Sequence, residues 1–290
     1  MDTAYYLNLA FNGLVEGSIY ALGALAITLV FGIARFPNAS TGDLMTVGAF
    51  GGLAGTLAGG GLLGAALAGV GVSAAVALAF HFLLFRNLAR RSAVASMIAS
   101  IGLAFFLRSA LSFIFGHDQR VYDLPLTRAV LFGPIRVQPT DLQVMGAAAA
   151  ALAVTFAVLH LTPIGRRMRA VADNPDLARA SGINAGRVMA VMWLMAGGLA
   201  GLGGVLLGAK TVVTPEMGWD LLLPAFAATI LGTIGNPIGA VLGGLLIGLV
   251  QELSTPFVGF TYKIGMGFAV LLLMLMIRPQ GLFARNALVR

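Results

Sequence analysis

LNLAFNGLVEGSIYALGALAITLVFGI, residues 7–33, sets the fold class of this chain, because Glu16 is its only charged residue. A helix that crosses the hydrocarbon core of a bilayer needs about 20 predominantly apolar residues, and this stretch exceeds that length. The composition agrees: 59% of the 290 residues are hydrophobic and only 10% are charged, whereas soluble domains carry about 25% charged residues. The sequence therefore predicts a helical membrane protein.

Further apolar runs follow this stretch and are equally poor in charge. They predict an all-α, polytopic membrane bundle of eight or nine transmembrane segments, forming a single domain over 1–290. The expected segments are 7–33, 43–60, 62–85, 93–115, 142–162, 187–208, 220–234, 237–252 and 262–279. The two short segments 220–234 and 237–252 are alternatively the two arms of a broken hairpin.

The arginines between and after these runs predict the orientation, because cytoplasmic loops carry an excess of Lys and Arg. An outside N-terminus and a cytoplasmic C-terminus bring three clusters to the cytoplasmic face: Arg86, Arg90 and Arg91; Arg166, Arg167, Arg169, Arg179 and Arg187; and Arg278, Arg285 and Arg290. The mixed-charge loop 116–141 then lies outside. Loop arginines explain the net charge of +7 without a nucleic-acid partner, and Arg166, Arg167 and Arg169 can reach lipid phosphates.

Two parts of the chain resemble each other. GDLMTVGAF (42–50) followed by LLGAALAG (62–69) is similar to WDLLLPAF (219–226) followed by PIGAVLGG (237–244). An odd number of predicted crossings separates the copies, so the second copy would be inverted in the membrane. Inverted repeats are typical of transport proteins. The alternative is a chance similarity between Gly- and Ala-rich sequences.

Glycines four residues apart predict close packing of the helices. Such pairs lie on one helix face and allow two backbones to approach each other in a membrane. The pairs are Gly197 and Gly201, Gly204 and Gly208, Gly239 and Gly243, and Gly244 and Gly248.

Motifs for covalent catalysis and for nucleotide or metal binding are absent from the sequence. The chain has no cysteine, and neither Lys210 nor Lys263 belongs to a GxxxxGK[ST] motif. His81, His117 and His160 lack a second histidine or a carboxylate at the spacing of metal ligands. We therefore expect no enzyme, no metal site and no bound cofactor.

Charged residues inside predicted spans are costly and suggest function. Glu16, one turn after Asn12, either lines a polar path or hydrogen-bonds a neighbouring helix. Arg108 lies nearer the outer end of its span, and we expect its side chain to extend to the membrane interface.

Asp43 and Asp220 each open an apolar segment, a position that first predicts helix N-caps. The alternative is a broken helix beside a translocation path, whose exposed N-terminus can attract an anionic group. The candidate path residues are Asn12, Glu16, Asn38, Asp43 and Asp220.

The polar insert GRRMRAVADNPDLARASGIN, 165–184, differs from the apolar sequence around it. Asn174 predicts an N-cap, Pro175 the first helical position, and Gly182 a left-handed helix stop. We expect a turn followed by a helix over 175–181, about 10 Å long and too short to span the membrane. The double capping favours a partner-docking element over a surface loop that only follows the positive-inside rule.

Several motifs in order resemble the permease subunits of branched-chain amino-acid ABC importers. They are NGLVEGSIYALGALAITLVFGI (12–33), PNASTGDLMTVGAF (37–50), ASMIASIGLAFFLR (95–108), GRRMRAVADNPDLARASGINAGRV (165–188), AGGLAGLGGVLLG (196–208), GTIGNPIGAVLGGLLIGLVQ (232–251) and RPQGLF (278–283). The resemblance covers nearly the whole chain.

This resemblance implies an amino-acid permease in the bacterial inner membrane, with partner proteins. Cytoplasmic ABC ATPases would bind the ATP, a periplasmic solute-binding protein would deliver the substrate, and a second permease, identical or different, would complete the path. The family's cytoplasmic coupling loop matches 163–187. The resemblance therefore marks Asp173, Asn174, Pro175, Ala178 and Gly182 as ATPase-coupling positions.

The sequence departs from the family where Asn38-Ala39-Ser40-Thr41-Gly42 replaces a run of the type Asn-Phe-Ala-His-Gly. This departure leaves the substrate open, because related permeases of the same scaffold carry urea or amides, sugars or nucleosides. An alternative of another class is an ion-coupled secondary transporter with Glu16 as the carrier.

Overall fold

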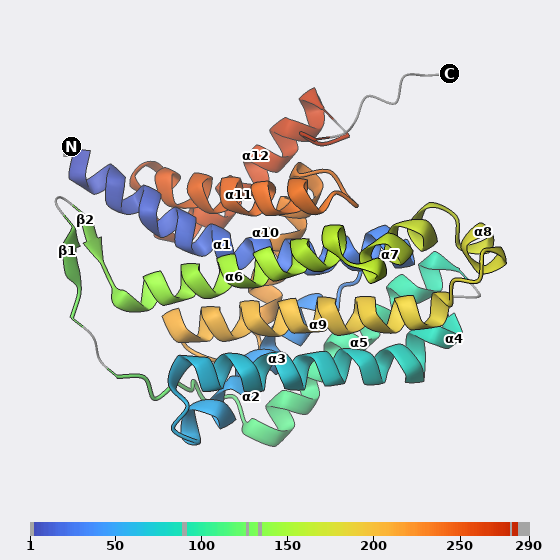
Figure 1. The fold of residues 1–290 in the computed structure, drawn as a ribbon. Coiled ribbons are helices and arrows are strands. Elements are labelled where there is room, and N and C mark those ends of the chain that lie inside the picture. Colours follow the sequence, from blue (N-terminus) through green and yellow to red (C-terminus); the bar gives the residue numbers. More distant parts are fainter. Residues whose placement is uncertain (1–2, 89–91, 126–127, 133–134, 279, 284–290) are drawn as a thin grey trace.

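The computed structural model describes residues 3–88, 92–125, 128–132, 135–278 and 280–283 and is a bundle of long helices (Figure 1). The helices are α1 (Thr3–Ala34), α2 (Thr41–Leu57), α3 (Gly61–Phe80), α4 (Arg86–Leu88), α5 (Ala93–Phe115), α6 (Pro139–Leu161), α7 (Pro163–Asp173), α8 (Pro175–Ala180), α9 (Ala185–Lys210), α10 (Met217–Leu231), α11 (Pro237–Val258) and α12 (Lys263–Ile277). A π-helical segment, His81–Phe85, joins α3 to α4, and a 3₁₀ turn, Phe260–Tyr262, precedes α12.

Each of the nine predicted spans corresponds to a helix in the described part of the chain. Seven helical segments are long and apolar enough to cross a membrane: Thr3–Ala34, Gly61–Leu88, Ala93–Phe115, Pro139–Leu161, Ala185–Lys210, Pro237–Val258 and Phe260–Ile277. The other two predicted spans are the shorter helices α2 and α10. The polytopic helical bundle is therefore confirmed, and α2 and α10 are its two shorter helices.

One detail of the prediction is wrong, and the structure adds a small element to the helical bundle. The loop between α5 and α6 contains an antiparallel hairpin, β1 (Val130–Phe132) and β2 (Ile135–Val137). Residues 163–173, expected as a turn, form the helix α7. We call the two ends of the bundle the hairpin end and the α8 end. Four arginines of the predicted cytoplasmic clusters lie outside the described residues: Arg90, Arg91, Arg285 and Arg290.

The long helices that precede the two similar segments make close glycine contacts. α1 starts at the hairpin end and α9 starts at the α8 end, so the two run in opposite directions (Figure 1). α1 packs on α11: a Cβ added at Gly17 would lie 2.9 Å from the Cα of Leu245. α9 packs closely on α3, since a Cβ at Gly201 would lie 2.7 Å from the carbonyl oxygen of Gly69. These opposed directions agree with an inverted repeat, which stays a prediction.

The two short helices meet each other inside the bundle. Gly42 in the first turn of α2 and Gly218 in the first turn of α10 touch so closely that a Cβ on either would overlap the other's carbonyl oxygen. The Gly218 N–H also donates to the Thr46 hydroxyl at 3.0 Å. The N-terminal ends of the two equivalent helices therefore face each other between the hairpin end and the α8 end.

Hydrogen bonds hold the segment before the hairpin against α2 and against the loop before α10. Arg120 and Val213 exchange backbone hydrogen bonds of 3.0 and 2.7 Å, which join the loop after α5 to the loop before α10. The buried Tyr122 donates its hydroxyl to the Ala49 carbonyl oxygen at 2.7 Å. Burial raises the pKa of this phenol, so it stays a protonated donor at physiological pH.

Candidate coupling segment and translocation path

The amphipathic helix α7 turns the chain back at the α8 end. Thr162 accepts a hydrogen bond from the Gly165 N–H, and Pro163 occupies the first turn, where its missing N–H is harmless. Gly165 packs so closely on the end of α6 that a Cβ would overlap the Leu159 carbonyl oxygen. Arg169 donates to that same carbonyl at 2.5 Å. α7 is therefore fixed to the end of α6.

The caps predicted for the short helix α8 are confirmed. The Asn174 side chain accepts hydrogen bonds of 3.0 Å from the N–H groups of Asp176 and Leu177. Gly182 has a φ of +80°. The Ile183 N–H donates to the Ala178 carbonyl and the Gly182 N–H to the Arg179 carbonyl, both at 3.0 Å, which is the Schellman pattern. α8 ends at Ala180, one residue before the predicted end.

The structure sorts the five predicted coupling residues by exposure. Asp173, Asn174 and Gly182 are exposed and Pro175 is half-buried, but Ala178 is buried against the bundle. The most prominent apolar side chain on α8 is Leu177, which is 64% exposed and which the sequence analysis did not select. The feature of the sequence that could have indicated Leu177 is a single large apolar residue among the charged residues of this loop.

Arg35 ties α1 to the coupling segment, a contact that the sequence did not predict. Its guanidinium donates to the carbonyl oxygens of Ala172 and Asp173 at 2.7 and 3.1 Å. These carbonyls end α7 immediately before α8 begins. Arg35 therefore connects the end of α1 to the junction between α7 and α8.

Asp43 does not cap α2, and Arg108 does not extend to the interface. Asp43 lies in the first turn of α2, fully buried, and accepts hydrogen bonds from Arg108 Nε at 3.1 Å and Nη2 at 3.3 Å. The guanidinium of Arg108 also lies 4.8 Å from the ring centre of Trp219. The ion pair neutralises two charges that would otherwise be costly inside the membrane.

Asp220 also does not cap its helix. It lies in the first turn of α10, after the N-cap position Glu216, and its side chain is exposed. The apolar side chains Phe105, Trp219 and Leu223 are also exposed, by 55%, 37% and 42%. Phe105 and Trp219 lie with ring centres 6.4 Å apart. An exposed carboxylate thus lies beside an aromatic surface, next to the meeting point of α2 and α10.

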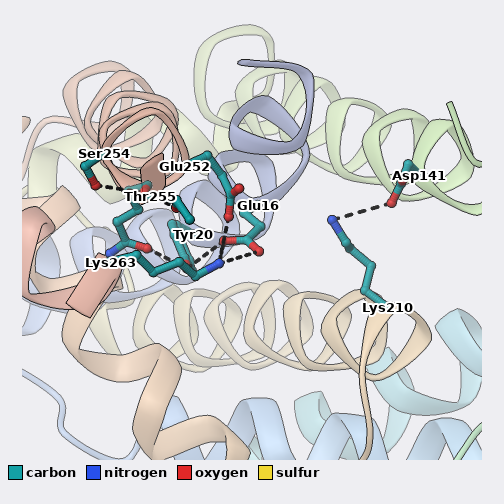
Figure 2. Close-up of polar contacts among 9 residues, drawn as sticks. Glu16, Tyr20, Asp141, Lys210, Glu252, Ser254, Thr255 and Lys263 are labelled. Atoms are coloured by element: carbon teal, nitrogen blue, oxygen red, sulfur yellow. Dashed lines mark hydrogen bonds and ion pairs between the residues drawn. The ribbon is translucent and has the colours of Figure 1, made fainter. Parts of the chain in front are cut away.

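Glu16 belongs to a charge network between α1, α11 and α12 (Figure 2). Lys263 Nζ donates to both Glu16 oxygens at 3.0 and 3.1 Å and to Glu252 at 2.7 Å. Tyr20 donates to Gln251 Oε1 at 2.9 Å and lies 3.3 Å from Glu16 Oε2. Two carboxylates thus share one ammonium group. Of the two alternatives predicted for Glu16, the hydrogen bond to a neighbouring helix is confirmed.

The remaining path candidates, Asn12 and Asn38, take part in no ion pair. Asn12 is half-buried on α1. Asn38 is buried before α2, where its side-chain oxygen accepts hydrogen bonds from the Ser40 N–H and hydroxyl. Among the described residues, no hydrogen bond or ion pair joins these two to Asp43, Asp220 or each other. The five candidates therefore form separate groups.

Another ion pair links α9 to α6, apart from the charge network of Lys263. Lys210 and Asp141 lie 3.4 Å apart and connect the end of α9 to the start of α6 (Figure 2). Within the described ranges, no three His, Asp or Glu side chains are grouped as metal ligands would be.

Comparison with known proteins relates the whole chain to one group. The family model described as "Branched-chain amino acid transport system / permease component" matches residues 9–277. The permease protein LivH of the high-affinity branched-chain amino acid transport system of Escherichia coli K12 is 29% identical over 297 residues, which are 97% of this chain and 96% of the relative. BraD of Pseudomonas aeruginosa is 29% identical over 298 residues, with the same coverage.

A solved structure shares the fold. PsaBC from Streptococcus pneumoniae, in complex with Fab, aligns with a TM-score of 0.51 and 15% identity. The alignment covers 95% of this chain and 92% of that chain. The likeness extends over nearly the whole bundle.

The Lys263 network predicts an unequal response to charge removal. Lys263→Met leaves two facing carboxylates without a cation, and breaking a buried pair in this manner costs about 3–5 kcal/mol. Glu252→Gln removes the excess negative charge and should change stability much less. Thermal unfolding of the detergent-solubilised protein measures both, and equal melting temperatures for the two variants would contradict the shared-ammonium arrangement.

Proposed function

Because the chain belongs to the family of branched-chain amino-acid transport permease components, we propose that it is the membrane permease subunit of an ABC importer. It translocates branched-chain or related amino acids across the bacterial inner membrane. Separate cytoplasmic ATPase subunits bind and hydrolyse the ATP, so the permease needs no cofactor of its own and catalyses no covalent step. A periplasmic solute-binding protein delivers the substrate.

The observation that carries this proposal is the doubly capped helix α8. A helix of six residues is too short to span, yet it has a side-chain N-cap and a Schellman stop. Fixed ends make it a rigid body that can transmit a push. α8 exposes Leu177 beside the Asp176–Arg179 ion pair, an apolar tip with a polar rim that suits a groove on a protein partner.

The arginines place α8 in the cytoplasm in this proposal. Arg166, Arg167 and Arg169 on α7, together with Arg179 and Arg187, lie at the α8 end. The positive-inside bias then sets the hairpin end, with the N-terminus, outside and the C-terminus in the cytoplasm. The loop 163–187 is accordingly the coupling loop of a single transmembrane domain, and its arginines also contact lipid phosphates.

Movement of α8 reaches the bundle through a short chain of contacts. Arg35 holds the α7–α8 junction to the end of α1. α1 in turn packs along α11 through Gly13 and Gly17, where a Cβ would lie 2.9 Å from the backbone of Leu249 or Leu245. Closure of the ATPases therefore shifts one half of the inverted repeat against the other, which alternates access to the path.

The translocation path lies at the meeting point of α2 and α10 in this proposal. An exposed carboxylate at this depth is costly against lipid, so Asp220 must face water or another protein. A second permease, identical or different, covers the surface formed by Phe105, Trp219, Asp220 and Leu223. The path then runs between the two permeases, past the Asp43–Arg108 pair. Asn12, Glu16 and Asn38 lie along its flanks.

Two alternatives remain distinct from this function. A permease of the same scaffold for urea or amides, sugars or nucleosides would differ only in substrate. An ion-coupled secondary transporter would use Glu16 as the carrier, but both oxygens of that carboxylate accept hydrogen bonds from Lys263, whose ammonium group it shares with Glu252.

Reconstitution separates these functions. We expect ATP-dependent uptake of labelled leucine, isoleucine or valine into proteoliposomes only when permeases, ATPases and binding protein are all present. A ligand screen of the cognate binding protein identifies the substrate independently. Uptake by the chain alone, driven by an ion gradient, would refute the importer.

Leu177→Glu should uncouple the ATPase. A charged side chain at the exposed apolar tip removes an interface contact worth about 1–2 kcal/mol, which corresponds to an affinity about tenfold lower. Co-purification and titration of the ATPase subunit measure the effect. Leu131→Glu is the matched control, because Leu131 is 66% exposed at the hairpin end. Equal loss in both variants would argue against docking at α8.

Asp220→Asn should slow uptake while leaving ATPase assembly intact. Loss of this exposed carboxylate near the meeting point of α2 and α10 changes the path but no buried pair, and we expect a rate about tenfold lower, a barrier change of about 1.4 kcal/mol. Glu216→Gln removes an exposed carboxylate four residues earlier and serves as control. Normal uptake kinetics in Asp220→Asn would exclude this residue from the path.

A further inference from the structure

A cavity of about 710 Å³ opens at the α8 end of the bundle. The end of α1, the π-helical segment after α3, the start of α5 and the α7–α9 region enclose it. Its size falls within about 300–1,000 Å³, the range of small-molecule sites. Neither Leu177 nor any candidate path residue lines it.

The inner wall of the cavity is aromatic. Phe85 stacks on Trp193 with ring centres 4.5 Å apart, and Phe36 stacks on Phe85 at 5.4 Å. His81 also stacks on Trp193, with ring centres 6.0 Å apart. Phe82, which also lines the cavity, is 47% exposed. This wall suits the apolar body of a ligand.

The rim is strongly basic. Four arginines line it, and among the described lining residues there is no Asp or Glu: Arg35, Arg86, Arg179 and Arg187. Arg35 binds backbone carbonyls and Arg179 pairs with Asp176. Arg86 and Arg187 are exposed, and their guanidinium groups make no hydrogen bond or ion pair within the part of the chain that the structure describes. These two guanidinium groups are available to an anion.

Two helix N-termini add to the positive potential of the rim. Ser92 and Ala93 begin α5, and Asn184 to Arg187 begin α9. The aligned peptide dipoles of these long helices favour a negative group at their N-terminal ends.

Two buried ring nitrogens of residues that line the cavity have no partner. The indole N–H of Trp193, a residue only 1% exposed, and the Nδ1 atom of His81, 4% exposed, have no hydrogen-bond partner among the described residues. An indole nitrogen can only donate, whereas the Nδ1 atom of a histidine donates or accepts according to its tautomer. Because buried polar groups in proteins are nearly always paired, the unpaired indole N–H of Trp193 favours a ligand with an acceptor atom.

We propose that this cavity binds an anionic amphiphile, in which a phosphate group is attached to an apolar body. Arg86 and Arg187 hold the phosphate, and Phe85 and Trp193 contact the apolar body. An acidic phospholipid of the adjoining leaflet and a soluble alkyl phosphate share this chemistry. Because Arg86 lies on α4 and Arg187 on α9, the bound molecule links two parts of the bundle beside α8. Binding itself does not depend on the importer function; only its effect on coupling rests on the proposed function.

Trp193 fluorescence tests the proposal directly. The chain has two tryptophans, so Trp219→Phe leaves Trp193 as the only reporter. The detergent-solubilised protein is titrated with dihexanoylphosphatidylglycerol and with hexyl phosphate. We expect a saturable fluorescence change with at least one of them, and the one that saturates at lower concentration identifies the source. An equal change with dihexanoylphosphatidylcholine, or saturation by inorganic phosphate alone, overturns the proposal.

Matched variants assign the binding to the cavity. Arg86→Gln with Arg187→Gln should weaken binding by about tenfold or more. Arg128→Gln with Arg136→Gln removes the same charge from exposed positions at the hairpin end, outside the cavity, and should leave binding unchanged. Ala190→Phe fills the cavity without changing charge and should abolish the fluorescence change. It tests the site independently if the double arginine variant fails to fold. Retained binding in Ala190→Phe, or equal loss in both arginine variants, refutes the site.

Discussion

Close backbone contact between helices is the constraint on which this structure depends. Lipid tails are as apolar as leucine, so helices in a membrane gain little from hydrophobic burial against each other and associate through tight van der Waals packing. Here the contacts at Gly17, Gly201 and the Gly42–Gly218 pair leave no room for a Cβ. They join α1 to α11, α9 to α3, and α2 to α10. The inverted repeat is therefore held together where its two halves touch through glycine.

The charges inside the bundle follow from this packing. Once α2 and α10 meet, Arg108 on α5 can reach Asp43 while lying over Trp219. Once α1, α11 and α12 are adjacent, Lys263 can serve both Glu16 and Glu252. Asp220 differs from these groups because its side chain is exposed at the meeting point of the two short helices. The carboxylates of Asp43, Glu16 and Glu252 are thus paired within the bundle, whereas that of Asp220 is exposed.

The α8 end combines a rigid helix, a link to α1 and an amphiphilic cavity. Arg35 holds the junction before α8, and its side chain also lines the cavity. Pro175 and Arg179 contribute to both the short helix and the cavity rim. A molecule bound in the cavity and a partner bound to α8 would therefore contact the same few residues, so that binding of one can affect binding of the other.

The membrane fold, the nine helical segments and the caps of α8 could be predicted from the sequence alone. Those features depend on apolar length and on residues within one or two turns, such as Asn174, Pro175 and Gly182. The tertiary structure decided the partners of Asp43, Glu16 and Arg108, the inward position of Ala178, the exposure of Leu177 and the cavity beside Trp193. Lys263 and Glu16 are far apart in the chain, and only the packing of α1 against α11 and α12 brings an ammonium group and a carboxylate within hydrogen-bond distance.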